Sequence, residues 1–91
     1  MKIVRTIVIE NPLGLHARPA AVFVQMAARF SSEIQVVRGD IRVSGKSIMG
    51  IMMLAAEQGA EIVVEVEGED AEECINALSA VLSADLEKDG Q

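Results

Sequence analysis

A histidine and an arginine lie close together in the stretch Asn11 to Ala20, and both side chains suit phosphoryl chemistry. His16 is the only histidine of the chain. An imidazole is a good nucleophile near neutral pH, and a guanidinium such as that of Arg18 binds phosphate oxygens in a bidentate manner. Most lone histidines are surface residues without a chemical role. The neighbouring residues nevertheless favour a site for a transferable phosphoryl group.

These neighbours predict that His16 stands at the beginning of a helix. A turn signal, Asn11-Pro12 with Gly14, precedes it, and an alanine-rich apolar segment over residues 17–30 follows. A helix N-terminus presents N–H groups without intrahelical partners and the positive end of the helix dipole, and both stabilise anions. Because Pro19 has no N–H, we expect the amides of Ala17 and Arg18 to face the phosphate.

A second feature is the segment from Lys46 to Leu54, which holds three methionines within five residues. Ser47 is suited to N-cap a short helix here, and a phosphate on Ser47 would also be favourable at a helix N-terminus. Two hypotheses therefore stay open for this serine, a plain cap and a regulatory switch. Ile51 is a core candidate like Leu54. The other apolar residues predict an adaptable contact surface, formed by Ile48, Met49 and Met52.

Other chemistry is poorly supported by the sequence. One histidine and one cysteine cannot make a transition-metal cluster, and Cys74 falls on the apolar stripe of a predicted helix. Gly45-Lys46-Ser47 is not a phosphate-binding loop, because Asp40 occupies the position of the required first glycine. We therefore expect a stoichiometric phosphoryl carrier, without metal or cofactor, rather than an enzyme.

Hydrophobic patterning predicts the elements that must position these residues. Strands are expected over residues 2–9, 33–38, 41–44 and 61–67, and helices over 17–30, 47–54 and from Asp70 onward, with Asp70 and Glu73 as a capping box. The strand side chains expected to face the core are Ile7, Ile9, Ile34, Val36, Ile62, Val64 and Val66. The order β-α-β-β-α-β-α predicts an α+β fold, with a four-stranded, mostly antiparallel sheet and three helices on one face.

Composition bounds the partners and the setting. The 91 residues suit one domain over residues 1–91, whose tail from about residue 86 is expected to fray. Residues 1–56 carry seven basic and three acidic side chains, which favours anions or acidic partners, whereas the absence of Trp and Tyr disfavours nucleic acid. A single cysteine, no apolar run of ~20 residues and no signal-peptide pattern predict a cytoplasmic protein without membrane insertion, and we also expect a monomer.

Two motifs resemble the signatures of a known family. Leu13-Gly14-Leu15-His16-Ala17-Arg18-Pro19-Ala20 is similar to the active-site signature of HPr, the histidine-containing phosphocarrier of the bacterial phosphoenolpyruvate-dependent sugar phosphotransferase system. Lys46-Ser47-Ile48-Met49-Gly50-Ile51-Met52 resembles its regulatory-serine signature. The motifs occur in the family's order, and the similarity extends to about Leu86. The resemblance implies an open-faced β-sandwich.

The resemblance also implies roles for individual residues. His16 would accept a phosphoryl group from Enzyme I on its Nδ1 atom, with Arg18 alongside, and pass the group to an EIIA domain. Ser47 would be the target of an HPr kinase/phosphorylase. The partner-docking surface would comprise Ile48, Met49 and Met52 together with Ala20 and Gln25 of the first helix. The alternative is a purely regulatory phosphorelay, or the nitrogen-related branch called NPr, without a complete sugar transporter.

Overall fold

The computed structural model describes residues 1–83, so the predicted fraying of the tail lies outside the described residues. Seven elements occur in the predicted order. The strands are β1 (Lys2–Val8), β2 (Glu33–Arg38), β3 (Ile41–Ser44) and β4 (Glu61–Glu67). The helices are α1 (Ala17–Ala27), α2 (Ile48–Met53) and α3 (Ala71–Ser83). No helix within this part of the chain combines the length and the apolar character that a membrane crossing requires.

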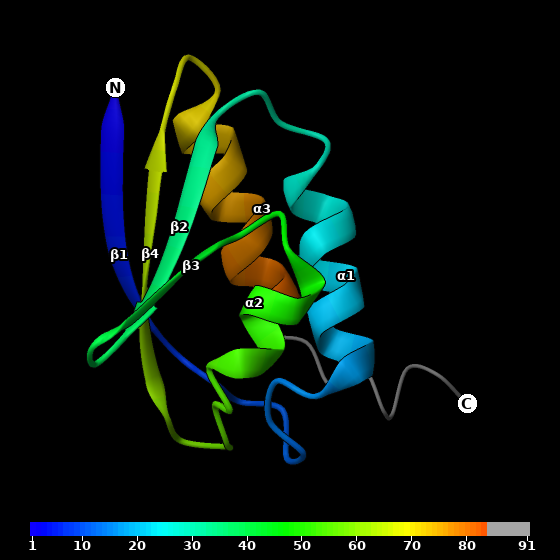
Figure 1. Ribbon diagram of the computed structural model, residues 1–91. Helices are drawn as coiled ribbons and strands as arrows, with labels where there is room; N and C mark the ends of the chain where they lie inside the picture. Colours follow the sequence, from blue (N-terminus) through cyan, green and yellow to red (C-terminus); the bar gives the residue numbers. More distant parts are fainter. Residues whose placement is uncertain (84–91) are drawn as a thin grey trace.

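The four strands form one sheet in the order β1-β4-β2-β3, and every neighbouring pair is antiparallel. The three helices lie together on one side of this sheet (Figure 1). Helix α3 packs on β1 and β4, α1 packs on α3 and α2, and α2 packs on β3. The α+β open-faced β-sandwich expected from the sequence is therefore confirmed.

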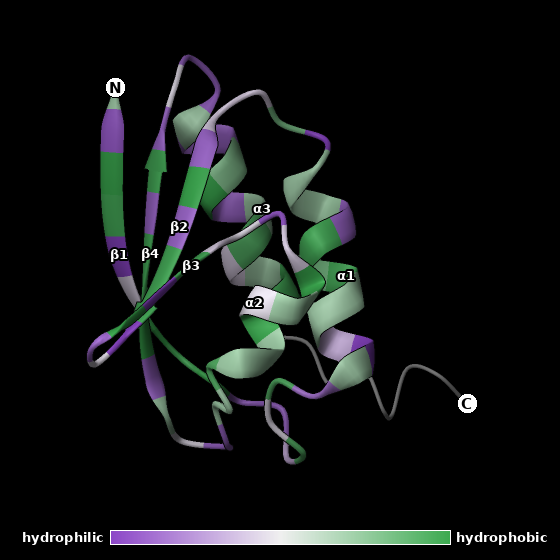
Figure 2. Ribbon diagram, viewed as in Figure 1, coloured by the Kyte–Doolittle hydropathy of each residue, from purple (hydrophilic) through white to green (hydrophobic). Residues whose placement is uncertain are grey.

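The core lies between the sheet and the helices, and alternation along the strands builds it. Figure 2 shows apolar and polar positions succeeding one another along β4, as a strand with one buried face requires. All strand residues expected to face inward are buried: Ile7, Ile9, Ile34, Val36, Ile62, Val64 and Val66. From the helices, the core receives mainly Phe23, Ala27, Ile51, Cys74, Ile75, Leu78 and Leu82.

Helix α1 is shorter than the predicted segment, which extended to Phe30. It ends at Ala27, and the amides of Arg29 and Phe30 then donate to the carbonyls of Met26 and Ala27, three residues earlier. This tightening is usual in a last helical turn. The ammonium group of Lys46 donates to the carbonyl of Phe30 at 2.9 Å, so a cation lies at this helix end.

Asp70 precedes α3 as predicted, but its carboxylate bonds elsewhere than to the first turn of that helix. It accepts hydrogen bonds from the amides of Ser31 and Ser32, at 2.8 and 3.1 Å, and from both serine hydroxyls. These bonds, first among them that from the Ser32 hydroxyl, lower the pKa of Asp70. Asp70 therefore ties the start of α3 to the loop between α1 and β2.

Candidate functional site

A tight turn carries the chain from β1 towards α1. The side-chain Oδ1 of Asn11 accepts from the amide of Leu13 at 2.9 Å, and its carbonyl accepts from the amide of Gly14 at 2.9 Å. Gly14 has φ of 73°, a left-handed conformation that suits glycine. The turn was predicted, but the role of the buried Asn11 side chain was missed. An Asn directly before Pro is the signal that could have indicated it.

His16 is the N-cap residue of α1. Its backbone is extended, with φ of −91° and ψ of −167°, and its carbonyl accepts the first helical hydrogen bond from the amide of Ala20 at 3.0 Å. The residue is partly exposed, but the Nε2 atom of its ring is buried. Because Nε2 is buried, it is poorly placed to react with a group that another molecule carries.

The first turn of α1 supplies the surroundings expected for an anion. Ala17 and Arg18 are the first two helical residues and both are exposed, whereas the ring of Pro19 is buried. The amides of Ala17 and Arg18 have no acceptor within the helix, because they lie in its first turn. The structure thus places His16, two donor positions and the positive end of the helix dipole at one helix end, with Arg18 as the second helical residue.

The loop before His16 is fastened to the segment that follows α2. The amide of Leu15 donates to the carbonyl of Ala56 at 2.7 Å, and Leu15 is buried. A Cβ atom at Gly14 would collide with the same carbonyl and with the Cα of Glu57. Figure 1 shows the two segments side by side at one end of the molecule. The position of His16 therefore depends on residues far along the chain.

Ser47 is the N-cap residue of α2, as the sequence predicted. Its Oγ accepts from the amide of Gly50 at 3.0 Å, and its carbonyl accepts from the amide of Ile51 at 3.0 Å. A Cβ at Gly50 would approach the Cβ of Val43 to 2.9 Å, so the glycine allows this short helix to lie directly against β3. The serine is partly exposed.

The exposed face of α2 forms an apolar surface. Ile51 and Leu54 are buried, as expected. The remaining side chains are 41% exposed for Ile48, 71% for Met49, 42% for Met52 and 64% for Met53. We call these four residues the methionine patch; Met53 was not predicted to belong to it. In Figure 2, α2 is green along most of its length.

The expectation that Ala20 contributes to the exposed face of α1 is wrong. Ala20 is fully buried, because it lies in helical register with Phe23 and Ala27, which face the core. A buried side chain cannot contact a partner. Gln25 is exposed, in agreement with its predicted place on the outer face of this helix.

The remaining chemical features lie apart from this site. Burial raises the pKa of the Cys74 thiol to about 11, so this cysteine is a poor nucleophile. Within residues 1–83, no cluster of His, Cys, Asp and Glu could hold a metal ion.

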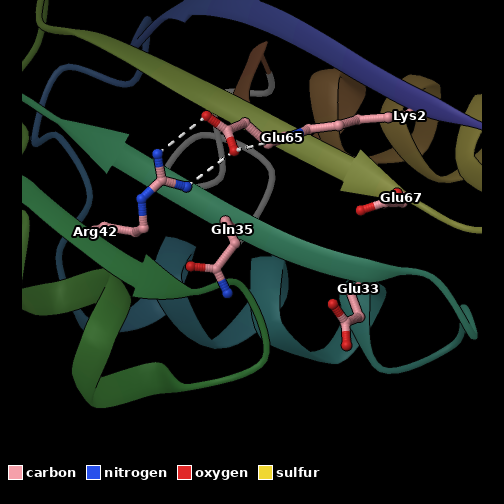
Figure 3. A pocket seen from close by; sticks show the side chains of 6 residues that line it. All are labelled: Lys2, Glu33, Gln35, Arg42, Glu65 and Glu67. Atoms are coloured by element: carbon pink, nitrogen blue, oxygen red, sulfur yellow. Dashed lines mark hydrogen bonds and ion pairs between the residues drawn. The ribbon is translucent and has the colours of Figure 1, made fainter.

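A shallow hollow of about 260 Å³ lies on the outer face of the sheet (Figure 3). There Arg42 donates to Glu65 at 2.9 Å, a hydrogen bond that lowers the pKa of this glutamate. The residues that line the hollow are Lys2, Glu33, Gln35, Arg42, Glu65 and Glu67. Because Glu65 and Glu67 alternate with buried Val64 and Val66, the hollow faces away from the helices.

Comparison with known proteins gives consistent matches. The family model described as "PTS HPr component phosphorylation site" matches residues 3–84. The phosphocarrier protein HPr of Treponema pallidum is 44% identical over 87 residues, which cover 96% of this chain and 99% of that protein.

Solved structures give the same picture. A crystal structure of a phosphocarrier protein HPr from Bacillus anthracis has a TM-score of 0.85 and 43% identity, covering 89% of this chain and 96% of that one. A crystal structure of an HPr dimer from Thermoanaerobacter tengcongensis has a TM-score of 0.69 and 52% identity, covering 82% of this chain and 86% of that one.

Proposed function

This chain belongs to the HPr family of phosphocarriers of the phosphotransferase system, and we propose that its His16 accepts a phosphoryl group from phospho-Enzyme I and passes it to an EIIA domain. The observation that carries this proposal is the position of His16. It is the N-cap of α1, with Nε2 buried, beside the first-turn amides and Arg18.

The chemistry proposed for His16 is a direct displacement at phosphorus. The lone pair of Nδ1 attacks the phosphoryl group, the bond from phosphorus to the donor breaks, and a P–N bond forms. The amides of Ala17 and Arg18 and the guanidinium of Arg18 stabilise the negative charge that arrives on the oxygens. Transfer to EIIA reverses these steps: the P–N bond breaks and a bond from phosphorus to a group of EIIA forms. Any further catalytic groups come from Enzyme I in the first transfer and from EIIA in the second.

The test is a labelling assay with Enzyme I and labelled phosphoenolpyruvate. We expect acid-labile label on the wild-type chain and none on His16→Ala. Ser47→Ala serves as a matched control that retains His16. An unlabelled wild-type chain, with an active Enzyme I and a known HPr in parallel, would refute the proposal.

The methionine patch is proposed as the docking surface for Enzyme I and EIIA, together with Gln25. Its support is the exposure of four apolar side chains on one short helix beside α1. Flexible thioethers adapt to partners of different shape. The chain is expected to act in the cytoplasm as a single-domain monomer, although at least two similar solved structures are dimers.

Phosphorylation of Ser47 by an HPr kinase/phosphorylase is proposed as a regulatory step at this surface. The hydroxyl lies at the end of the helix that carries the methionine patch. A phosphate there would add charge next to apolar side chains and oppose docking by desolvation and repulsion. Incubation with such a kinase and ATP should give acid-stable phosphate on Ser47, and none on Ser47→Ala.

A purely regulatory role is the second candidate, and the exposed methionine patch supports it as well, because docking needs no phosphate. In this case the chain would control a transcription factor or a kinase by docking alone, without passing on a phosphoryl group. A regulatory function kept by His16→Ala and lost by Met49→Ala would support this candidate. Loss in His16→Ala would support the phosphocarrier.

A further inference from the structure

Arg38, the last residue of β2, reaches across to the end of α2. Its Nη1 donates to the carbonyls of Leu54 and Ala55, at 3.1 and 2.8 Å. Its Nη2 lies 2.8 Å from a carboxylate oxygen of Glu57. One guanidinium therefore holds three groups of the segment 54–57.

The segment that Arg38 holds is the one that fastens the His16 loop. The carbonyl of Ala56 accepts the amide of Leu15, and Gly14 packs against the backbone of Ala56 and Glu57. Ala55 has φ of 49°, which is unfavourable for an alanine and needs surrounding contacts to persist. The path from Arg38 to His16 thus runs through two hydrogen bonds, from Arg38 to Ala55 and from Leu15 to Ala56, and through the backbone of Ala56 and Leu15.

We propose that Arg38 is a positioning residue of the phosphoryl-transfer site. It fixes the backbone of residues 54–57, which sets the carbonyl of Ala56 and through it the loop that presents His16. It also holds the end of α2, so it couples His16 to the methionine patch. The expected effect on transfer rests on the function proposed above; the expected effect on the loop does not.

The contacts of Arg38 differ from those of an ordinary surface ion pair. Arg42 on the neighbouring strand makes a comparable pair with Glu65, at 2.9 Å, but on the outer face of the sheet (Figure 3). The Arg42 side chain is 53% exposed, against 31% for Arg38, and both of its Nη atoms donate to Glu65. Arg42→Ala is therefore a control that loses an arginine–glutamate pair without touching the segment 54–57.

The test is amide hydrogen exchange of Leu15 in the wild type, Arg38→Ala, Arg38→Lys and Arg42→Ala, with amides at the centre of β4 reporting global opening. In Arg38→Ala we expect exchange of Leu15 to accelerate about tenfold relative to the β4 amides. In Arg38→Lys the exchange of Leu15 should be faster than in the wild type and slower than in Arg38→Ala, because an ammonium cannot bridge all three groups. Arg42→Ala should leave the ratio of Leu15 to β4 exchange unchanged.

Transfer kinetics from phospho-Enzyme I complete the test. We expect kcat/KM to fall about tenfold in Arg38→Ala and to stay unchanged in Arg42→Ala. The proposal would be overturned if Arg38→Ala accelerated exchange of the Leu15 and β4 amides equally, or if Arg38→Ala and Arg42→Ala changed exchange and kcat/KM to the same extent. If Arg38→Ala does not fold, Arg38→Lys is compared with Arg42→Ala in the same way. Failure of the wild type to accept phosphate would refute the proposed function while the exchange data still decide the role of Arg38.

Discussion

The chemistry proposed for this molecule depends on very few residues. In this proposal His16 supplies the nucleophile, and the Nε2 atom of its ring is buried. Arg18 and two backbone amides supply the positive charge, because a helix begins at Ala17. Their proximity in sequence explains why this part of the site was predictable. Local spacing alone predicted that His16 and Arg18 stand at the start of a helix, which the structure shows.

Arg18→Ala tests the role of the guanidinium. We expect kcat/KM for transfer from phospho-Enzyme I to fall about tenfold, because a charge-assisted hydrogen bond to the phosphate is lost. Arg18→Lys should recover part of the activity, since it keeps the charge without the bidentate geometry. Steady-state kinetics would measure both. Equal rates for the wild type and Arg18→Ala would remove Arg18 from the mechanism.

Ser47 allows charge and capping to be separated. Asp and Asn both cap helices about as well as Ser, so Ser47→Asp adds a negative charge while Ser47→Asn adds none. We expect Ser47→Asp to raise the KM for Enzyme I several-fold and Ser47→Asn to leave it near the wild-type value. Should the two variants behave alike, charge at this position has no regulatory effect and Ser47 is only a cap.

At the scale of elements, the helices and strands were predicted well, but the phase of α1 was predicted only in part. Arg18, Gln25 and Arg29 marked an exposed face, and all three are exposed. Ala20 was placed with the docking residues because a family motif includes it. Its burial follows from helical register with Phe23, which the motif does not contain.

Gly14→Ala tests how closely the His16 loop must approach the segment after α2. The variant combines a left-handed alanine with a collision against the carbonyl of Ala56. Gly39→Ala is the matched control, because Gly39 also has positive φ, 59°, but nothing lies within 4 Å of its Cβ position. Urea unfolding should show a loss of about 1–2 kcal/mol for Gly39→Ala and a larger loss for Gly14→Ala.

The two glycine variants should also differ in function. In the absence of urea, where the variant is folded, Gly14→Ala is expected to slow phosphoryl transfer, because the loop that presents His16 is displaced. Gly39→Ala lies at the β2–β3 turn and should transfer at the wild-type rate. If both variants transfer equally well, the anchoring of this loop is irrelevant to the site.

At the scale of the whole molecule, carboxylates that accept hydrogen bonds link stability to pH. The pKa of Asp70 is lowered by Ser32 and Ser31, and that of Glu57 is lowered by backbone hydrogen bonding and by Arg38. A lowered folded-state pKa stabilises the fold above the unfolded-state pKa, and this contribution is lost as the pH falls through the folded-state value. The urea midpoint should therefore decrease as the pH falls below about 4.

Asp70→Asn isolates one part of this dependence. Near pH 7 its urea midpoint should lie below that of the wild type, and the difference should shrink in acid, where Asp70 of the wild type is protonated. Asp40→Asn, at the exposed turn between β2 and β3, removes the same formal charge and serves as the control. If the difference in urea midpoint between the wild type and Asp70→Asn stayed constant from pH 7 into acid, the account would be contradicted.

The connections between distant segments were the part that the sequence could not predict. The sequence marks Arg38 only as the residue before a turn, although alternation places it on the same face of β2 as Ile34 and Val36. Its partners at residues 54, 55 and 57 become neighbours only when α2 lies against the sheet. Likewise, Ala56 carries no side-chain signal, because its contribution is a backbone carbonyl.

The most direct test of the central claim is phosphorus–nitrogen NMR of the chain after phosphorylation by Enzyme I and phosphoenolpyruvate, with nitrogen-15 in its single histidine. We predict one phosphorus signal coupled to Nδ1 of His16. The resemblance to the HPr family implies this atom, and the burial of Nε2 supports it. Coupling to Nε2, or phosphate on a residue other than His16, would contradict the account.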